Sequence, residues 1–303
     1  MQSRQIKGFR DDHRFRPLAT IGASVTAIER SPGKINRMKI PVFHVDAFTD
    51  QPFKGNPAAV CLLDSWLDDA GMHKVAAENN VSATAFMVPS NGGYALRWFT
   101  ARSEIKLCGH ATLASAYVVL NLLQPRLDCV QFSTQFRGEL TVRPDGERLA
   151  MNFPATIAKT CAYPPEVIRA LGPSIHRSDV VEALEVSDTY LVVLNSQNLV
   201  RILRPDVALL ENLHPYAVSV TASGEDSDFV SRYFAPSYGI PEDPVTGSAH
   251  CMLAPYWAQR IGKPILHARQ LSERGGELWC ELAGDRVILK GKAVYVMKGT
   301  LTI

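Results

Sequence analysis

Two short segments of the chain share one design, and each opens a strongly apolar helix. LCGHAT (107–112) leads into the run ATLASAYVVLNLL, and EDPVTGSAH (242–250) leads into CMLAPYWAQRIG. In each, a glycine followed by small or polar residues starts a helix whose first N–H groups have no partner within the helix, which favours bound anions. Gly109 and Gly247 lie 138 residues apart, the difference of their numbers. The pattern predicts two similar halves that face one cleft, with a small carboxylate bound in it.

The composition is that of an ordinary globular chain and excludes several functional classes. The 303 residues are 46% hydrophobic and 20% charged, and this length suits two domains. A formal net charge of +2 gives no reason to expect a nucleic-acid or acidic-membrane partner. No apolar run is long enough to span a bilayer. Six cysteines without CxxC or CxxH spacing predict reduced thiols in a cytoplasmic protein, and no metal site.

The first 37 residues differ from the rest of the chain. They are rich in arginine, show little hydrophobic periodicity and precede Met38. Asp11, Asp12 and Glu29 argue against a transit peptide, and a secretory signal would need a continuous apolar core. We expect residues 1–37 to be a disordered extension, or the result of an over-long gene start.

From Lys39 onward, strand and helix patterns alternate. Helices are expected at 64–80 (capped by Asp64 or Ser65), 109–123, 165–171 and 248–261. Strands are expected at 40–46, 84–88, 94–100, 129–133, 138–143, 149–153, 190–194, 199–203, 217–221 and 229–234, with a further set between 265 and 302.

The two apolar helices indicate the fold class. Residues 118–123 (VVLNLL) are apolar around more than one helical stripe, so that helix needs apolar neighbours on nearly every side. A curved sheet wrapped around a central helix provides them, which predicts an α+β protein with halves at 38–153 and 154–303. The C-terminal strands are candidates to join the first half. Short hairpin connections make a doubly wound parallel sheet the less favoured alternative.

Asp243 and His110 are the candidate proton-transfer groups. Asp243 precedes Pro244, which favours an extended backbone and could direct the carboxylate across the mouth of the cleft. Capping of the following helix is an equally weighted alternative. His110 begins an apolar helix beside Cys108 and is either a proton donor or a buried structural histidine.

Other polar residues could contact a ligand. Ser248 could donate its hydroxyl to a ligand oxygen, or serve only as an N-terminal helix residue, whereas His250 is interpreted as structural. Asp46, Asn56 and Pro57 are expected on a glycine-containing loop after the first strand, a common place for ligand contacts. KGNP lacks the GK[ST] element of a phosphate loop.

The motifs DAFTDQPFKGNPAAV, RWFTARSEIKLCGHAT, FAPSYGIPEDPVTGSAH and RGG (274–276) together resemble the phenazine-biosynthesis PhzF-like family, in order, from about Met38 to the C-terminus. That family is similar in fold to diaminopimelate epimerase. The resemblance implies two domains related by pseudo-twofold symmetry, each a barrel-like sheet around a central helix, with the site between them. It also implies a cofactor-free isomerase of small cyclic acids, and frequent homodimers.

One position departs from the family pattern. Members usually read SETAF where this chain reads SATAF, so Ala83 stands where the family's proton-shuttling Glu is expected. A methyl group transfers no proton. The substitution is either engineered, or natural in a member that uses another base, or natural in a member that only binds.

Three functions follow as hypotheses. The first is an isomerase that moves a proton within a small carboxylate, with Asp243 and His110 as acid/base or orienting groups. Gly109, Gly247, Ser248 and Asn56 would then bind the ligand. The second is a catalytically silent binding or interaction module of the same fold, which Ala83 favours. The third, an amino-acid racemase with two facing thiols, is disfavoured because Thr246 stands where the second thiol would be needed.

Overall fold

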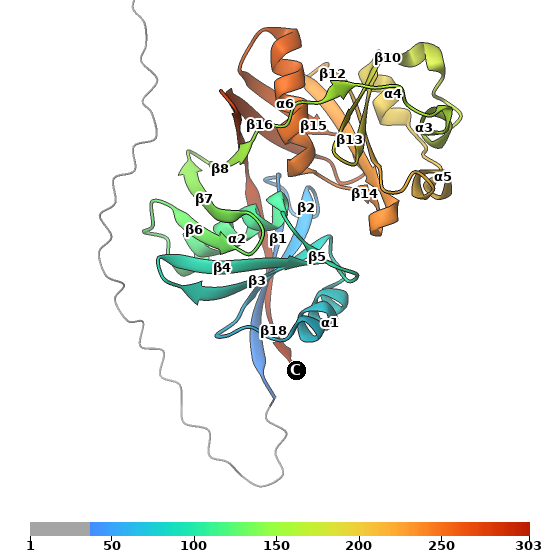
Figure 1. Ribbon diagram of the computed structural model, residues 1–303. Helices are drawn as coiled ribbons and strands as arrows, with labels where there is room; N and C mark the ends of the chain where they lie inside the picture. Colours follow the sequence, from blue (N-terminus) through green and yellow to red (C-terminus); the bar gives the residue numbers. More distant parts are fainter. Residues whose placement is uncertain (1–36) are drawn as a thin grey trace, which may run out of the picture. The chain divides into compact units, whose positions relative to one another are not determined.

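Strands dominate residues 37–303, the part of the chain that the computed structural model describes (Figure 1). The expectation for residues 1–37 therefore concerns, apart from Arg37, residues that the structure does not describe. The strands are β1 (Lys39–Ala47), β2 (Asn56–Leu62), β3 (Ala83–Ser90), β4 (Gly93–Phe99), β5 (Glu104–Ile105), β6 (Val130–Thr134), β7 (Gly138–Asp145), β8 (Arg148–Pro154), β9 (Lys159–Thr160), β10 (Val180–Val186), β11 (Thr189–Leu194), β12 (Ala217–Ser223), β13 (Phe229–Ala235), β14 (Ile240–Asp243), β15 (Ile265–Gln270), β16 (Gly276–Ala283), β17 (Arg286–Gly291) and β18 (Ala293–Thr302). The α-helices are α1 (Asp69–Asn79), α2 (Gly109–Tyr117), α3 (Pro165–Ala170), α4 (Gln197–Ile202), α5 (Val207–Glu211) and α6 (Gly247–Ile261).

The strand pairing occurs twice in the same order. Among β1 to β8, two neighbouring pairs are parallel: β2–β3 and β4–β6. The other four are antiparallel: β1–β2, β3–β4, β6–β7 and β7–β8. Strands β10 to β17 repeat this series, with β14 in the place of β5 and α6 in the place of α2. The sheet is mixed, as expected for an α+β fold. The chain therefore contains two similar halves.

The two halves share one sheet. Strand β8 pairs antiparallel with β17, so the first series continues into the second. The chain then returns, because β18 follows β17 and pairs with β1 over nearly its whole length. We use "first half" for β1–β8 with β18, and "second half" for β9–β17. The boundary expected between residues 153 and 154 falls at the end of β8; independent folding of the halves stays a prediction.

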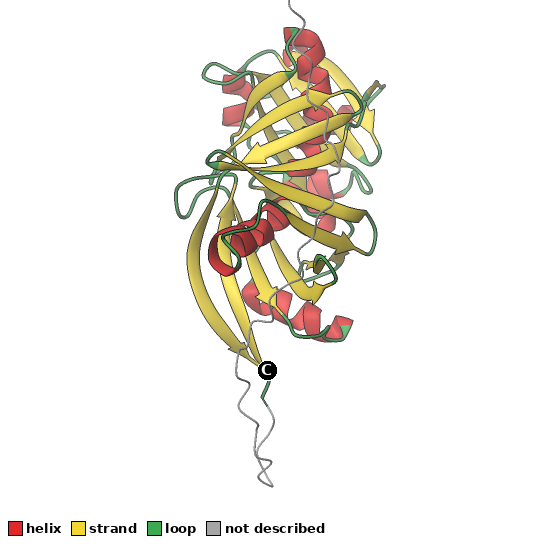
Figure 2. Ribbon diagram, turned by 90° about the vertical axis from the view of Figure 1, so that its left-hand side faces the viewer, coloured by secondary structure: helices red, strands yellow, loops and turns green. Residues whose placement is uncertain are grey.

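Each half wraps its strands around one buried helix, and strands lie on several sides of the helices in Figure 2. Eight of the nine residues of α2 are buried, and the helix continues as a wider π-helical turn, Val118–Leu123. In α6, Pro255 cannot donate to the carbonyl of Cys251. The N–H of Thr156 donates to that carbonyl instead, at 3.0 Å, so the irregularity in α6 holds the segment that follows β8.

Three local expectations are wrong. Residues 199–203 were expected to form a strand but lie largely in α4, where the Ser196 hydroxyl accepts from the N–H of Leu199 as a helix cap. The helix expected from residue 64 begins at Asp69, because the Asp68 carboxylate caps it through the N–H of Gly71. The early loop is shorter than expected, since Asp46 lies within β1, and β2 begins at Asn56.

Candidate active site

The site begins where the two central helices meet. Helix α2 begins at Gly109 after Cys108, helix α6 begins at Gly247 after Thr246, and neither preceding residue caps its helix with a side chain. A Cβ built on Gly109 would lie 3.5 Å from the Cα of Gly247. The two helix ends therefore lie so close that one methyl group would fill the gap between the two glycines in ordinary van der Waals contact.

Both helix ends keep free N–H donors. The first bonds within the helical turns are Thr112 N–H to Cys108 O at 3.0 Å and His250 N–H to Thr246 O at 3.3 Å. In the first turns, the Ala111 N–H donates to the Cys108 sulfur. The remaining N–H groups have no acceptor among the described residues: those of Gly109, His110, Gly247, Ser248 and Ala249. Two positive helix-dipole ends with free donors favour an anion at this point.

Asp243 supplies the carboxylate beside these donors. It ends β14 in an extended strand, as expected, and is only 8% exposed. One carboxylate oxygen accepts from Asn56 Nδ2 and the other from Thr246 Oγ1, both at 2.7 Å. Burial raises the pKa of Asp243 to about 6, and the charge of Glu242 adds to the rise, whereas the two hydrogen bonds lower it. A carboxyl group with this pKa exchanges protons readily near neutral pH.

Asn56 and Gln270 hold Asp243 in place from the two halves. Asn56, from the first half, also donates to the carbonyl of Val245 at 2.9 Å. Gln270 Nε2 donates to the backbone carbonyl of Asp243 at 2.6 Å, and its Oε1 accepts from the N–H of Thr246 at 2.8 Å. The turn between Asp243 and α6 is thus fixed by side-chain amides on both sides.

The first helix end has a different chemistry. The Cys108 sulfur lies 3.4 Å from His110 Nδ1. Burial raises the pKa of the Cys108 thiol to about 12, with the charge of Asp243 adding to the rise, and burial lowers the pKa of His110 to about 3. At neutral pH this end therefore presents a thiol and a neutral imidazole. His110 can donate or accept one hydrogen bond, but it carries no positive charge.

A groove of about 260 Å³ lies beside the helix ends. The exposed Ser248 lines it, together with Leu107, the residue before Cys108. Tyr233, the cross-strand partner of Asp243, also lines it and hydrogen-bonds to Thr189. Arg137 is the cation among the lining residues. Ser248 and Arg137 give the groove donors for a small carboxylate, whereas Asp243, His110, Gly109 and Gly247 do not line it.

Asp46 does not act as a free ligand-binding group. Its carboxylate accepts from the N–H of Phe53 at 2.7 Å and from Arg274 Nη2 at 2.8 Å. Arg274 also donates to the carbonyl of Gly55 at 2.8 Å. The motifs DAFTDQPFKGNP and RGG therefore tie a loop of the first half to a loop of the second half.

Ala83 lies close to this arrangement along the sheet. It begins β3 and pairs with Ala58, two residues after Asn56. Its side chain is fully buried within the hydrophobic cluster that also contains Cys108 and Ala111. The methyl group thus occupies an apolar place near the helix ends and offers no proton.

Inspection of the sequence missed three residues of the site. Gln270 and Tyr233 sit in strands whose pattern predicted only β structure, and Arg137 sits in a turn. The available signal for Gln270 was its position in β15, where it follows the apolar alternation of Leu266 and Ala268 on the buried side of the strand. Among residues 37–303, no group of three His, Cys, Asp or Glu side chains has a metal-ligand arrangement, and no helix there is long and apolar enough to cross a membrane.

The fold and the site together define a class: α+β proteins with two similar halves and two glycine-headed helices whose N-terminal ends meet. The model of the family described as "Phenazine biosynthesis-like protein" matches residues 45–299. The chain belongs to this family, so the resemblance drawn from its motifs is confirmed.

Relatives and solved structures agree with this membership. An uncharacterized isomerase of Pseudomonas aeruginosa is 50% identical over 264 residues, which cover 87% of this chain and 99% of the relative. The crystal structure of a PhzF-family protein from Enterococcus faecalis has a TM-score of 0.82 at 43% identity, covering 88% of this chain and all of that one. A predicted epimerase of Pseudomonas aeruginosa, 21% identical with a TM-score of 0.69 over 86% of this chain and 99% of its own, shares the fold.

Proposed function

We propose that the chain is an isomerase that moves a proton within a small, cyclic carboxylate by acid/base catalysis without a cofactor. The observation that carries the proposal is Asp243, a buried carboxyl group with a pKa of about 6 beside two facing helix ends with free N–H donors. Such a pairing is suited to proton transfer next to an anion.

The roles follow from the geometry. The free N–H groups of Gly109, Gly247 and Ser248 would bind the substrate carboxylate and stabilise the charge that develops during the reaction. Asp243, ionised above about pH 6, would take a proton from one carbon and return it to another, so that substrate and product are isomers. Asn56 and Thr246 keep the carboxylate oriented, and the neutral His110 would orient the substrate.

Ala83 sets the scale of the expected activity. Loss of a general base commonly costs about 10²–10⁴-fold in rate. If Asp243 alone serves as the acid/base group, the chain retains slow proton exchange, because positioning at the helix ends still contributes.

The test is deuterium uptake. The chain would be incubated in D₂O with a panel of small cyclic and amino carboxylates, and uptake read by mass spectrometry, beside Ala83→Glu and its isosteric control Ala83→Gln. Uptake by the parent chain that Asp243→Asn abolishes supports Asp243 as the base. Uptake by Ala83→Glu and not by Ala83→Gln identifies an isomerase scaffold that lacks one base.

A second candidate function is a binding module without catalysis, which the methyl group of Ala83 favours. A panel carboxylate that raises the melting temperature of every variant, with no deuterium uptake by any of them, would establish this function instead. If no carboxylate of the panel gives deuterium uptake and none raises the melting temperature, both functions are contradicted.

The two-thiol racemase stays the least favoured alternative. Thr246 occupies the position in α6 that corresponds to Cys108 in α2, and a thiol with a pKa of about 12 is a poor thiolate source. Loss of D/L interconversion in Cys108→Ser would revive it. A cytoplasmic homodimer is part of the main proposal, and light scattering of the purified chain tests the dimer.

A further inference from the structure

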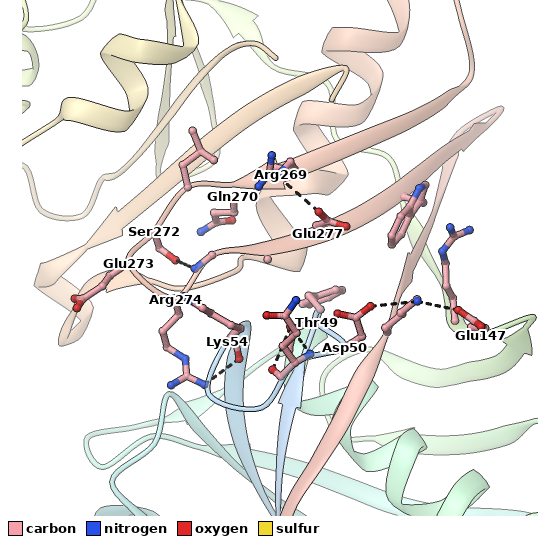
Figure 3. A pocket seen from close by; sticks show the side chains of 18 of the residues that line it. Thr49, Asp50, Lys54, Glu147, Arg269, Gln270, Ser272, Glu273, Arg274 and Glu277 are labelled. Carbon is pink, nitrogen blue, oxygen red and sulfur yellow. Dashed lines mark hydrogen bonds and ion pairs between the residues drawn. The ribbon is translucent and has the colours of Figure 1, made fainter. Parts of the chain in front are cut away.

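A second cavity is lined by Gln270, which holds the backbone of Asp243, but not by Asp243 itself. It has a volume of about 880 Å³ and is shown in Figure 3. Its walls come from five segments: the loop Phe48–Lys54 after β1, the turn Asp145–Arg148 between β7 and β8, Arg201 of α4, residues 269–279 of β15, β16 and their connection, and Lys292 between β17 and β18. We call it the polar crevice. Its size lies within the range of small-molecule sites.

The charges that line the polar crevice are unevenly paired. It contains six cations (Lys54, Arg148, Arg201, Arg269, Arg274 and Lys292) and five carboxylates (Asp50, Asp145, Glu147, Glu273 and Glu277). Four of the carboxylates are in ion pairs: Asp50 and Glu147 with Lys292, Asp145 with Lys290, and Glu277 with Arg269. Figure 3 shows the pairs of Asp50, Glu147 and Glu277 as dashed lines.

Three lining cations form no ion pair among the described residues: Lys54, Arg148 and Arg201. Arg148 is still close enough to Glu147 for its charge to help lower the pKa of that carboxyl group. Arg274 is already engaged by Asp46. Only Glu273 remains as an unpaired acid in the lining. The lining as a whole carries a net formal charge of +1, six cations against five carboxylates, in a cavity that both halves build. The positive excess lies with the three cations that make no ion pair, and together these offer enough donors for an anion with two charges.

Arg148 gives the crevice a preformed receptor. Its guanidinium carbon lies 3.6 Å from the centre of the Trp279 ring, so the planar group is held against the indole. Trp279 is in turn stacked on His267, with ring centres 5.0 Å apart. The Arg148 Nε is buried and has no hydrogen-bond partner. A fixed, unpaired guanidinium is the group that binds phosphate or carboxylate through two parallel hydrogen bonds.

We propose that the polar crevice is a second ligand site that binds a small organic dianion through Arg148, Arg201 and Lys54. The shared chemistry is two negative charges, from either a phosphate monoester or a dicarboxylate. The site is separate from the carboxylate groove beside Ser248, and the proposal does not depend on the isomerase function.

Calorimetric titration of the full chain at low salt tests the proposal with three probes of similar size: phenyl phosphate, phthalate and benzoate. We expect the dianions to bind and the monoanion benzoate to bind at least about tenfold more weakly, because a charge-assisted hydrogen bond is lost. Binding of phenyl phosphate alone identifies a phosphate monoester as the ligand class, whereas binding of phthalate as well identifies dianions in general.

Variants locate the binding. Arg201→Gln with Lys54→Gln changes exposed side chains and should weaken dianion binding at least about tenfold. Arg148→Lys keeps the charge but loses the planar fork, and should also weaken it. The control Arg126→Gln removes an exposed arginine outside the crevice that makes no ion pair, and should leave binding unchanged.

Two results would overturn the proposal. One is the absence of binding by both dianions at millimolar concentration. The other is dianion binding that the crevice variants leave unchanged, which would place the ligand elsewhere, for example in the groove beside Ser248.

Discussion

The helix end at Gly109 and the helix end at Gly247 occupy corresponding places in the two halves, yet their surroundings differ. Asp243 lies three residues before Thr246, and the position three residues before Cys108 is Ile105. Both end a short strand that pairs with the preceding long one. The repeated fold therefore supplies two helix ends with free N–H donors, whereas only the second half supplies a carboxyl group beside them.

The supporting contacts are equally one-sided. Asp243 is held by amide side chains from both halves, Asn56 and Gln270. At the other end, Cys108 and His110 contact each other within an apolar cluster that includes Ala83. Under the proposed function, binding and proton transfer would therefore be separable: binding would need both helix ends, and proton transfer would depend on the second.

The largest effect is expected from Asp243→Asn. In whichever form of the chain shows deuterium uptake, this variant should lower the rate by about 10²–10⁴-fold, because it removes the acid/base group. The amide can still accept from Asn56 and donate to Thr246, so the fold should be retained. His110→Gln is the matched change at the first end and should cost less than about tenfold. Equal losses in both variants would abolish the distinction between the two ends.

Stability should depend on pH through Asp243. The pKa of about 6 lies above the ordinary value of 3.8, so the folded state favours the protonated form. The contribution of Asp243 to the free energy of unfolding is therefore largest below pH 3.8, decreases as pH rises through 6, and falls by about 3 kcal/mol in total. Asp243→Asn lacks this dependence. In urea unfolding at several pH values, the free energy of unfolding of Asp243→Asn should rise relative to that of the parent chain as pH rises. A difference between the two that stays constant with pH would contradict the assigned pKa.

The glycine contact is tested by adding methyl groups. In Gly109→Ala or Gly247→Ala alone, the new Cβ meets the other glycine's Cα at 3.5 Å, an ordinary contact. In the double variant the two methyl groups would overlap in the same space between the helix ends. Its free energy of unfolding should therefore fall by about 1–3 kcal/mol more than the sum of the two single changes. Gly299→Ala has open space around its Cβ, and its combination with Gly109→Ala should be additive. Additivity of the double variant in urea unfolding would show that the helix ends are not in contact.

The smallest effect concerns two threonines at corresponding helix ends. Thr246→Val removes a hydrogen bond that lowers the pKa of Asp243, so that pKa should rise further above its value of about 6. Thr112→Val removes a hydrogen bond of 2.6 Å to the carbonyl of Cys108 and should leave that pKa unchanged. Titration of the carboxyl carbon by NMR measures both. A similar rise in the two variants would mean that general loosening, and not the direct bond, sets the pKa.

The sequence predicted much of this arrangement because its signals were local. Glycine before an apolar helix specifies an uncapped helix end, and Pro244 specifies the extended backbone at Asp243. Residues 199–203 were mispredicted because Val200 and Leu203 are apolar in a short segment, where strand and helix patterns coincide. The N-cap of Ser196, which accepts from the N–H of Leu199, favours the helix over the strand.

Long-range partners could not be predicted. Asn56 and Asp243 are 187 residues apart in sequence, and no local pattern pairs them. The same holds for Arg274, which reaches the carboxylate of Asp46 across the sheet. Arg148 and Trp279 belong to strands whose alternation indicates burial but not which neighbour stacks on which ring. These contacts exist only once the strand order is set.

The pairing of β1 with β18 has a consequence for synthesis. Lys39 lies opposite Thr302, and Ala47 opposite Ala293. One edge of β1 therefore stays unpaired until β18 is synthesised, and β18 begins 246 residues after β1 ends (Ala47 to Ala293). Until then a ribosome-bound chain exposes the free edge of a largely apolar strand, which is open to pairing with other chains. Nascent chains that stop before β18 should therefore depend on a chaperone to stay soluble, and release from that dependence should coincide with the emergence of β18.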